Sequence, residues 1–216
     1  MLPTAGADRR RIAGRFDAAA VASVVPAATG RWLVLVRRAG VEPLVVTPRT
    51  GIGLRFRYRR AELGADRVCA AVGARQSHAG NVVIVDFGTA ITVNAVSHGG
   101  TFIGGFIVPG PDAILATLAG STAQLPRLRT FRPGRESALP RTTRNAIRSG
   151  VATLVVSSVG ALIDRAAGEL GRPCRVIATG GRARDFARLI PSIDLVEPDL
   201  ALRGLNAILN RHRARR

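Results

Sequence analysis

Three short motifs in this sequence combine residue types that could handle phosphate chemistry. Asp86-Phe87-Gly88-Thr89 separates two runs of β-branched residues; a glycine there lets backbone N–H groups approach an anion, and the carboxylate suits a cation beside phosphate. Thr179-Gly180-Gly181 follows a strand-like run and precedes a helix-like one, a place where a turn can contact a nucleotide. Gly64-Ala65-Asp66-Arg67 sets an acid beside a base at the expected start of a helix.

Each motif also has an ordinary structural interpretation. The D-x-G-T motif between two strands is typical of a hairpin turn, and T-G-G often does no more than connect a strand to a helix. Asp66 suits a capping position, with Arg67 in solvent. Taken singly, the motifs leave both interpretations open.

The elements that must position the motifs follow from residue patterns. In the first half, Asp17–Pro26 indicates a helix end leading into a strand, Arg31–Val36 is apolar without alternation, and Glu62–Gly73 has helical spacing. Strands are predicted over the following runs: Val41–Thr47, Leu54–Arg60, Asn81–Val96 with a break at the D-x-G-T motif, and Thr101–Val108.

After residue 110, helices and strands alternate, which indicates an α/β fold. Helices are predicted over Asp112–Ala119, Thr142–Gly168 with Gly160 as a candidate break, Arg182–Leu189 and Asp199–Arg211. Strands are predicted over Arg175–Ala178 and Ile193–Val196, and Leu125–Pro140 is a Pro- and Arg-rich exposed loop.

Composition excludes several classes of protein. With 216 residues, 47% hydrophobic and 21% charged, the chain can build a real core, so disorder as the main state is excluded. The longest nearly uncharged helical run, Val151–Ile163, is shorter than the ~20 residues of a membrane span, so no transmembrane segment is expected. Cys69 and Cys174 lack metal-site spacing, and the start of the sequence lacks a signal-peptide pattern, which favours the reducing cytoplasm.

The net charge of +18 is unusual. The sequence has 32 arginines and no lysine. Such a charge can reflect an anionic partner such as nucleic acid, or compositional drift towards arginine. The arginines are spread along the chain, and only Arg211–Arg216 forms a dense basic cluster. Net charge alone does not separate the two explanations.

The order and spacing of eight longer blocks resemble the type III pantothenate kinase family, from about Val21 to the end of the chain. The blocks are TGIGL (50–54), AELGADRVCAAVGA (61–74), VDFGTAITVNAV (85–96), FIGGFIVPG (102–110), TAQLPRL (122–128), TTRNAIRSGV (142–151), ATGGRA (178–183) and PDLALRGL (198–205).

This resemblance implies an α/β chain with the actin-like ATPase (ribonuclease H-like) fold of the acetate and sugar kinase superfamily. It also implies a homodimer with its pantothenate pocket near the subunit interface. The implied reaction is ATP-dependent phosphorylation of pantothenate, the first step of coenzyme A synthesis, with Mg²⁺ and a monovalent cation, K⁺ or NH₄⁺. Residues 1–74 would hold a remnant of the N-terminal subdomain and the start of the substrate site, and residues 75–216 the C-terminal subdomain.

The resemblance also implies roles for residues of the substrate pocket. Asp66 would be the general base that accepts the proton of the pantothenate hydroxyl. Gly64, Ala65 and Arg67 would line the pocket, and Thr143 matches a later substrate-contacting threonine of the family.

A second group matches the family's nucleotide site. Asp86 would bind the monovalent cation, and Gly88 and Thr89 would contact ATP. Gly180 and Gly181 would approach the adenosine.

Three departures from the family pattern bear on activity. The family begins with a strand and a D-x-G-N-T phosphate loop, and nothing before Val21 resembles it, so the N-terminal subdomain is expected to be incomplete and activity severely reduced. Arg57 stands at a tyrosine position and Arg59-Arg60 replace Asn-Pro. Asn94 stands where a second acid is expected.

Two hypotheses therefore follow from the sequence. The first is a type III pantothenate kinase, truncated or diverged. The alternative is a non-catalytic regulatory or nucleic-acid-binding relative that reuses the fold and its arginine-rich surface. A steep fall of nucleic-acid affinity with salt would favour the alternative.

Overall fold

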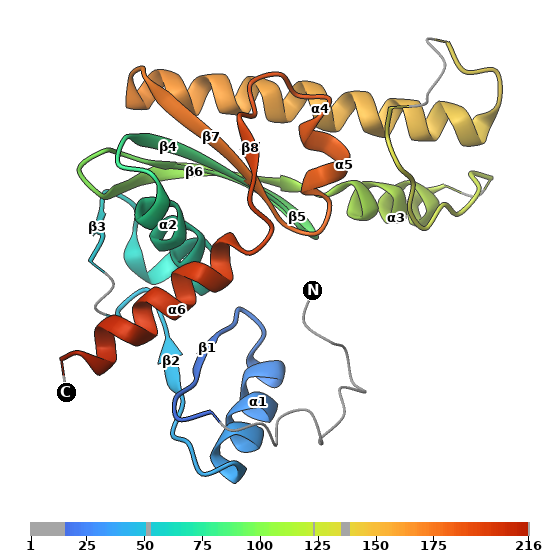
Figure 1. Ribbon diagram of the computed structural model, residues 1–216. Coiled ribbons are helices and arrows are strands. Elements are labelled where there is room, and N and C mark those ends of the chain that lie inside the picture. Colours follow the sequence, from blue (N-terminus) through green and yellow to red (C-terminus); the bar gives the residue numbers. More distant parts are fainter. Residues whose placement is uncertain (1–15, 51–52, 123, 135–138, 216) are drawn as a thin grey trace. The chain divides into compact units, whose positions relative to one another are not determined.

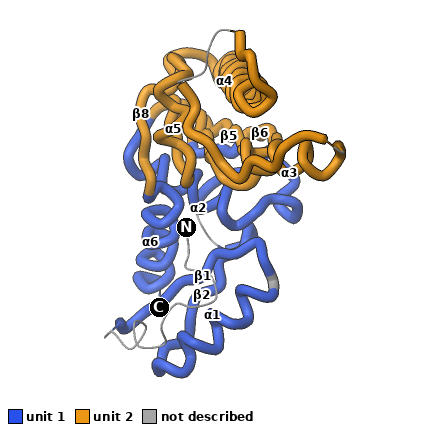
Figure 2. The backbone as a smooth tube through the Cα atoms, turned by 90° about the vertical axis from the view of Figure 1, so that its right-hand side faces the viewer, with its two compact units in different colours: residues 1–79, 100–102, 199–216 blue, residues 80–99, 103–198 orange. Residues whose placement is uncertain are grey.

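The structure is a computed structural model that describes residues 16–50, 53–122, 124–134 and 139–215 (Figure 1). The chain forms two compact units that are interleaved in sequence (Figure 2). Unit 1 comprises residues 1–79, 100–102 and 199–216, and unit 2 comprises residues 80–99 and 103–198. The boundary between the N-terminal and C-terminal subdomains, expected between residues 74 and 75, stays a prediction.

Unit 2 is built on a sheet with the strand order β6-β5-β4-β7-β8. Its strands are β4 (Asn81–Phe87), β5 (Ala90–Val96), β6 (Thr101–Pro109, from Ile103 on), β7 (Cys174–Thr179) and β8 (Leu195–Val196). Strands β4 and β5 are antiparallel, so the D-x-G-T motif is the turn of a hairpin. Strands β4 and β7 are parallel with Asp86 opposite Thr179, so the D-x-G-T and T-G-G turns leave neighbouring strands at the same edge.

The core of unit 2 lies between the sheet and α4 (Thr143–Leu170), which runs along the sheet in Figure 1. Successive strand residues point to opposite faces, and one face of β4 and β5 buries Val83, Val85 and Phe87 together with Ile91 and Val93. The following α4 residues complete this cluster: Val151, Val155, Val159, Ile163 and Ala166. Because their spacing is three or four residues, they form one face of the helix.

Helix α4 begins where the sequence predicts, and it is not interrupted at Gly160. The Thr142 hydroxyl accepts a hydrogen bond from the Asn145 amide at 3.3 Å, which caps the start. The candidate break at Gly160 is wrong, since a helix tolerates one glycine at a cost of about 1 kcal/mol when its other residues pack well. By length and composition alone the 28-residue helix could cross a membrane, although one of its faces belongs to the core of unit 2.

Two shorter helices complete unit 2: α3 (Pro111–Ser121), which packs against α4, and α5 (Ala183–Ala187), which packs against β7 and β8. The rings of Phe87 and Phe186 stack with centroids 5.8 Å apart, which joins the end of β4 to α5. The described part of Leu125–Pro140 has no helix or strand, as predicted, but the expected exposure is wrong for Leu128, Phe131 and Pro133, which are buried; residues 135–138 lie outside the description.

Unit 1 contains a parallel pair of strands, β1 (Ala20–Ala22) and β2 (Leu44–Val46), and the helix α1 (Pro26–Arg38). The short strand β3 (Arg55–Phe56) pairs in parallel with Thr101 and Phe102 and precedes a 3₁₀ turn, η2 (Arg60–Glu62). The helices α2 (Ala65–Ser77) and α6 (Leu200–Arg213) pack tightly against each other.

Two predictions for this unit are wrong in part. Arg31–Val36, to which no element was assigned, belongs to α1, and the helix end expected within Asp17–Pro26 is wrong, since no helix precedes β1 in the described residues from Phe16 on. The alternation over Leu54–Arg60 is real, since Phe56 and Tyr58 are more buried than the arginines beside them, but only Arg55 and Phe56 pair as a strand, with Thr101 and Phe102.

The contact between α2 and α6 depends on two glycines. A Cβ atom on Gly204 would lie 1.8 Å from the Cys69 carbonyl oxygen, and one on Gly73 would lie 2.2 Å from that of Leu200. The backbones therefore approach more closely than any side chain would allow.

We expect Gly204→Ala to separate these helices and to lower the free energy of unfolding by about 1–3 kcal/mol. The matched control is Gly30→Ala, an exposed helical site in α1 with no atom within 4 Å of the added carbon. Urea unfolding followed by circular dichroism measures both variants. Equal midpoints for the two would contradict the packing argument.

Candidate functional site

The first group of candidate residues lies where the parallel strands β4 and β7 end beside each other. Gly180 has a positive φ of 92°, and a Cβ atom there would lie 2.3 Å from Asp86 Oδ1 and 2.8 Å from both the nitrogen and the oxygen of Phe87. Only glycine lets the T-G-G turn come this close to the carboxylate. Asp86 and Gly180 are therefore brought together, and Gly181 beside them is exposed.

A third segment closes around the D-x-G-T turn. The Gly110 amide donates a hydrogen bond to the Thr89 carbonyl oxygen at 2.9 Å. A Cβ atom on Gly110 would lie 2.4 Å from the Gly88 oxygen and 2.5 Å from the Thr89 oxygen. Helix α3 starts at the next residue, so a helix N-terminus, which favours anions, lies beside this turn.

Gly110 was not singled out by the sequence analysis, although it lies within a matching block. A Pro-Gly-Pro sequence before a helix was the available signal. That signal predicts a turn, but it does not reveal which backbone the glycine must approach.

A separate group of candidate residues lies in unit 1, at the start of α2. Gly64 precedes the helix, and Asp66 is in its first turn, where the helix dipole stabilises a carboxylate. Asp66 Oδ1 accepts a hydrogen bond from the Arg67 amide at 2.8 Å. A Cβ atom on Gly64 would lie 2.4 Å from that oxygen, so the glycine makes room for the carboxylate. Ala65 is buried.

Arg67 is 6% exposed and is held by two aromatic rings of the same unit. Its guanidinium carbon lies 5.2 Å from the Tyr58 ring centre and 5.5 Å from that of Phe102. Such cation–π contacts fix the position of an arginine without neutralising its charge. Tyr58 was missed by the sequence analysis because only folding brings it beside Arg67.

The three arginines near Tyr58 that replace family residues lie on the surface. Arg57 is exposed, Arg59 forms an ion pair of 3.3 Å with Glu62, and the Arg60 guanidinium lies 5.0 Å from the Phe56 ring centre. The third departure, Asn94, is buried on β5 and donates a hydrogen bond to the Thr92 hydroxyl at 3.0 Å. A neutral amide thus stands where the family pattern has an acid.

The remaining candidate, Thr143, is the first residue of α4 and is exposed. It belongs to unit 2 together with Asp86 and the two glycine turns, whereas Gly64–Arg67 belong to unit 1. The structure therefore groups the cation and nucleotide candidates in unit 2 and the proton-accepting candidate in unit 1.

Asp86 places one carboxylate, a candidate cation ligand, where β4 ends. No group of three or more His, Cys, Asp or Glu side chains suited to a metal occurs in the part of the chain that the structure describes. A single carboxylate is an oxygen ligand of the kind that hard cations prefer, and the Gly180 turn packs closely against it. Mg²⁺ usually relies on substrate phosphates for several of its ligands, so it needs few carboxylates from the protein.

Neither cysteine is poised to react. Burial raises the pKa of the Cys69 thiol to about 12, and the charge of Asp66 adds to the shift. Burial also raises the pKa of the Cys174 thiol.

We therefore expect Cys69 to react with a maleimide at pH 8 about 10³-fold more slowly in the folded chain than in urea, since only the thiolate attacks. Mass spectrometry of timed, quenched samples separates the two cysteines. Equal rates for folded and unfolded Cys69 would show that the start of α2 opens in solution.

Comparison with known proteins identifies the family. A model of the family described as type III pantothenate kinase matches residues 3–165. The chain is 38% identical to the type III pantothenate kinase of Rhodospirillum rubrum, over 92% of this chain and 78% of that protein. It is 35% identical to that of Rhizorhabdus wittichii, over 98% of this chain and 81% of that protein.

A crystal structure of a Baf family protein from Campylobacter jejuni has a similar fold. Its TM-score is 0.66 at 20% sequence identity, and the match covers 95% of this chain and 88% of the other. The observed α/β elements agree with the actin-like ATPase fold that the resemblance implies. From the family match and the identities to two curated kinases, the chain belongs to the type III pantothenate kinase family.

Proposed function

We propose that this chain transfers the γ-phosphoryl group of ATP to the hydroxyl of pantothenate. The observation that carries the proposal is the parallel register of β4 and β7, which sets Gly180 against Asp86 in a chain of this family. Two glycine turns and a helix N-terminus at one edge provide backbone N–H groups for phosphates, as phosphoryl transfer requires.

In this proposal the residues of unit 2 bind the nucleotide. Gly88 and Thr89 hold the phosphates, and Gly180 and Gly181 let the adenosine approach the backbone. Asp86 holds K⁺ or NH₄⁺, which would offset phosphate charge when bound, and Mg²⁺ would be held largely by the ATP phosphates. Asp86 and the turns thus orient the γ-phosphate before transfer.

The residues of unit 1 act on pantothenate. Asp66 accepts the proton of the hydroxyl as its oxygen attacks phosphorus. Arg67 offers a positive charge to the pantothenate carboxylate. Because its two aromatic neighbours already hold the side chain in place, it loses little conformational entropy when pantothenate binds. Gly64 and Ala65 line the pocket. Thr143, which belongs to unit 2, is proposed as a further pantothenate contact through its hydroxyl.

We further propose a cytoplasmic homodimer that uses the outer face of α4. From Ala146 to Ala161, after the exposed Arg144, none of the exposed residues of α4 is charged, and Leu154 is 54% exposed. The other exposed residues of this stretch are Ala146, Gly150, Thr153, Ser157 and Ala161. A charge-free face about 22 Å long is unusual on a solvated helix, which supports burial against a second copy. Light scattering after gel filtration measures the mass.

The test of the activity is transfer of label from γ-labelled ATP to pantothenate by the purified chain with Mg²⁺ and K⁺. We expect label to appear in phosphopantothenate, at a rate reduced by the absence of a D-x-G-N-T motif from this sequence. A folded chain that binds ATP and transfers nothing would contradict the proposal.

Exposed arginines near the end of α6 favour nucleic-acid binding as a second candidate function, in a chain whose net charge is +18. Arg211 and Arg215 are exposed and can contact phosphates, whereas Arg213 forms an ion pair of 2.7 Å with Asp17. Titration with a labelled duplex at several salt concentrations tests it: binding with a steep salt dependence would support the candidate, and no binding at low salt would reject it.

A further inference from the structure

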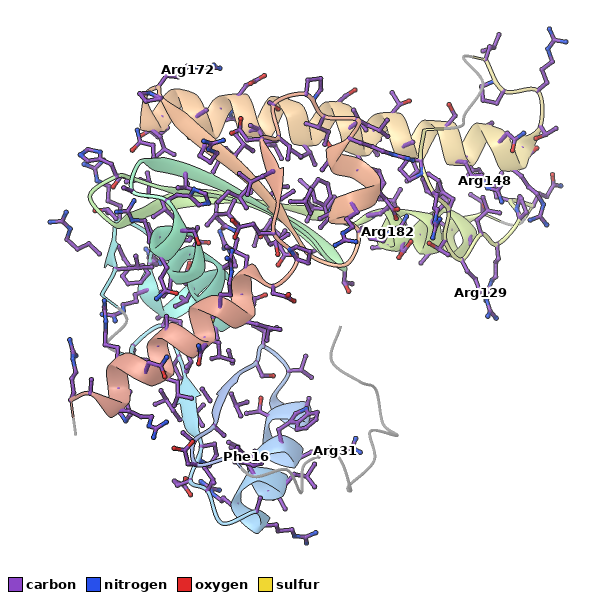
Figure 3. The ribbon with its side chains drawn as sticks, in the orientation of Figure 1. Phe16, Arg31, Arg129, Arg148, Arg172 and Arg182 are labelled. Atoms are coloured by element: carbon purple, nitrogen blue, oxygen red, sulfur yellow. The ribbon has the colours of Figure 1, made fainter. Side chains whose placement is uncertain are left out.

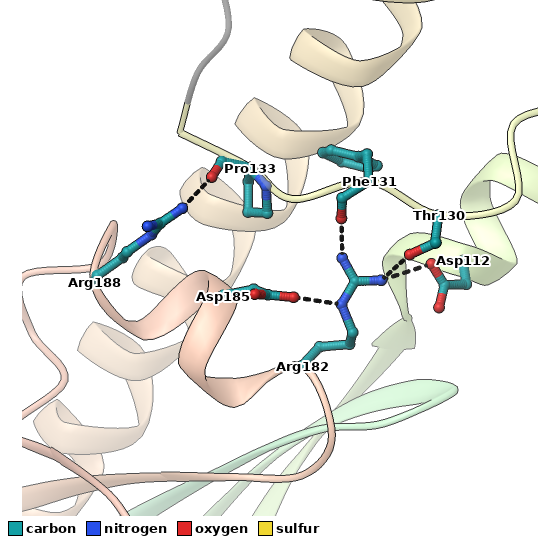
Figure 4. A network of polar contacts seen from close by, with 7 residues as sticks. All are labelled: Asp112, Thr130, Phe131, Pro133, Arg182, Asp185 and Arg188. Carbon is teal, nitrogen blue, oxygen red and sulfur yellow. Dashed lines mark hydrogen bonds and ion pairs between the residues drawn. The ribbon is translucent and has the colours of Figure 1, made fainter.

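Arg182 is the residue directly after the T-G-G turn. Its side chain donates hydrogen bonds to four different residues (Figure 4). Its side chain is 15% exposed. Nε donates to Asp185 at 3.0 Å, and Nη1 donates to both Asp112 and the Thr130 hydroxyl at 2.8 Å. Nη2 donates to the carbonyl oxygen of Phe131.

These contacts join three separate segments of unit 2. Asp185 lies on α5, Asp112 lies in the first turn of α3, and Thr130 and Phe131 belong to the irregular segment 124–134. The Arg182 backbone amide also donates to the Phe87 carbonyl oxygen at 3.1 Å, at the end of β4. One residue thus connects the T-G-G turn to the D-x-G-T strand through its backbone and to α3 through its side chain.

The irregular segment has no helix or strand to hold it in place. Leu128 and Phe131 are buried in the core of unit 2, and the Arg188 guanidinium donates to the Pro133 carbonyl oxygen. Among the described residues, Arg182 provides polar contacts from the segment towards α3, and Arg182 and Arg188, at the two ends of α5, both attach the segment to that helix. Because a guanidinium offers five donors in a rigid fork, arginine can serve all these acceptors at once, whereas lysine has three donors at one point.

We propose that Arg182 is a positioning residue that fixes the distance between the T-G-G turn and the N-terminus of α3, and thereby the geometry of the ATP site. It acts through these two segments and touches no substrate. The proposal rests on the nucleotide half of the proposed function, because the segments it joins are those assigned to ATP.

The experiment compares Arg182→Leu, Arg182→Lys and Thr130→Val with the control Arg184→Leu, an exposed arginine on the same short helix. Calorimetry with ATP alone measures binding without any need for turnover. Trypsin cleavage after the exposed Arg127 and Arg129 measures attachment of the segment; Figure 3 shows Arg129 pointing outwards. Steady-state kinetics gives separate KM values for ATP and pantothenate.

For Arg182→Leu we expect ATP affinity to fall about tenfold or more and cleavage after Arg129 to accelerate, with the KM for pantothenate within about twofold. Arg182→Lys should recover part of the ATP affinity because it keeps one charge near Asp112 and Asp185. Thr130→Val should accelerate cleavage and weaken ATP binding less, since it leaves the Asp112 contact in place. Arg184→Leu should match the parent chain.

Unchanged ATP affinity in Arg182→Leu would overturn the proposal, even with faster cleavage, because Arg182 would then only anchor the segment. Should Arg182→Leu fail to fold by circular dichroism, Arg182→Lys and Thr130→Val decide by the same two readouts. A parent chain that binds ATP but does not phosphorylate pantothenate would reject the proposed reaction and leave the Arg182 test intact. A parent chain that does not bind ATP would reject both.

Discussion

Replacing Asp66 by asparagine is expected to lower kcat for pantothenate phosphorylation by about 10²- to 10⁴-fold, the usual contribution of a general base. Asparagine has almost the same shape, and its Oδ1 can still accept the hydrogen bond of the Arg67 amide. The start of α2 should therefore persist while the ability to accept a proton is lost. Initial rates with labelled ATP measure the effect.

The matched control is Asp164→Asn, an exposed carboxylate on α4, which should leave kcat unchanged. Circular dichroism and thermal unfolding of both variants exclude a folding defect. Turnover of Asp66→Asn at the parental rate would exclude Asp66 as the base and would leave its carboxylate with only a capping role at the start of α2.

Gly180→Ala is expected to weaken ATP binding by at least about tenfold and to destabilise the chain by about 1–3 kcal/mol. The added carbon would lie 2.3 Å from Asp86 Oδ1, and the positive φ of 92° strains any residue with a side chain. Either the turn moves away from β4 or Asp86 does. Calorimetry with ATP and urea unfolding measure the two effects.

Gly181→Ala is the matched control. It changes the neighbouring glycine of the same motif, but no atom lies within 4 Å of the added carbon, so it tests the motif without a steric clash. Its free energy of unfolding should equal that of the parent chain. If Gly180→Ala were as stable as Gly181→Ala and bound ATP normally, the close approach to Asp86 would have no part in the site.

Sequence patterns predicted the parts of the fold that depend on local periodicity. The β-branched runs on both sides of Asp86 gave the hairpin, and the spacing after Thr142 gave α4. Arg31–Val36 was not assigned because an apolar run of five residues, Trp32–Val36, fits a helix and a strand equally well.

The candidate site residues that stay predictions come from motifs, whereas the neighbours that the structure adds depend on tertiary contacts. Asp66, Asp86 and Gly180 follow from their motifs. Tyr58 and Arg182 do not, since the neighbours that define them, Arg67 for one and Asp112 for the other, are distant along the chain or on other elements. Periodicity describes one element at a time, and such contacts depend on two or more.

The close packing of α2 against α6 has a consequence for synthesis of the chain on the ribosome. Unit 2 ends at Pro198, so all of its residues are translated before α6. The helix that carries Asp66 acquires its glycine-to-backbone contacts only when the last 17 or so residues emerge. A nonsense mutation shortly before Leu200 would therefore leave unit 2, with the proposed nucleotide residues, intact. It would remove α6, against which the helix that carries Asp66 packs.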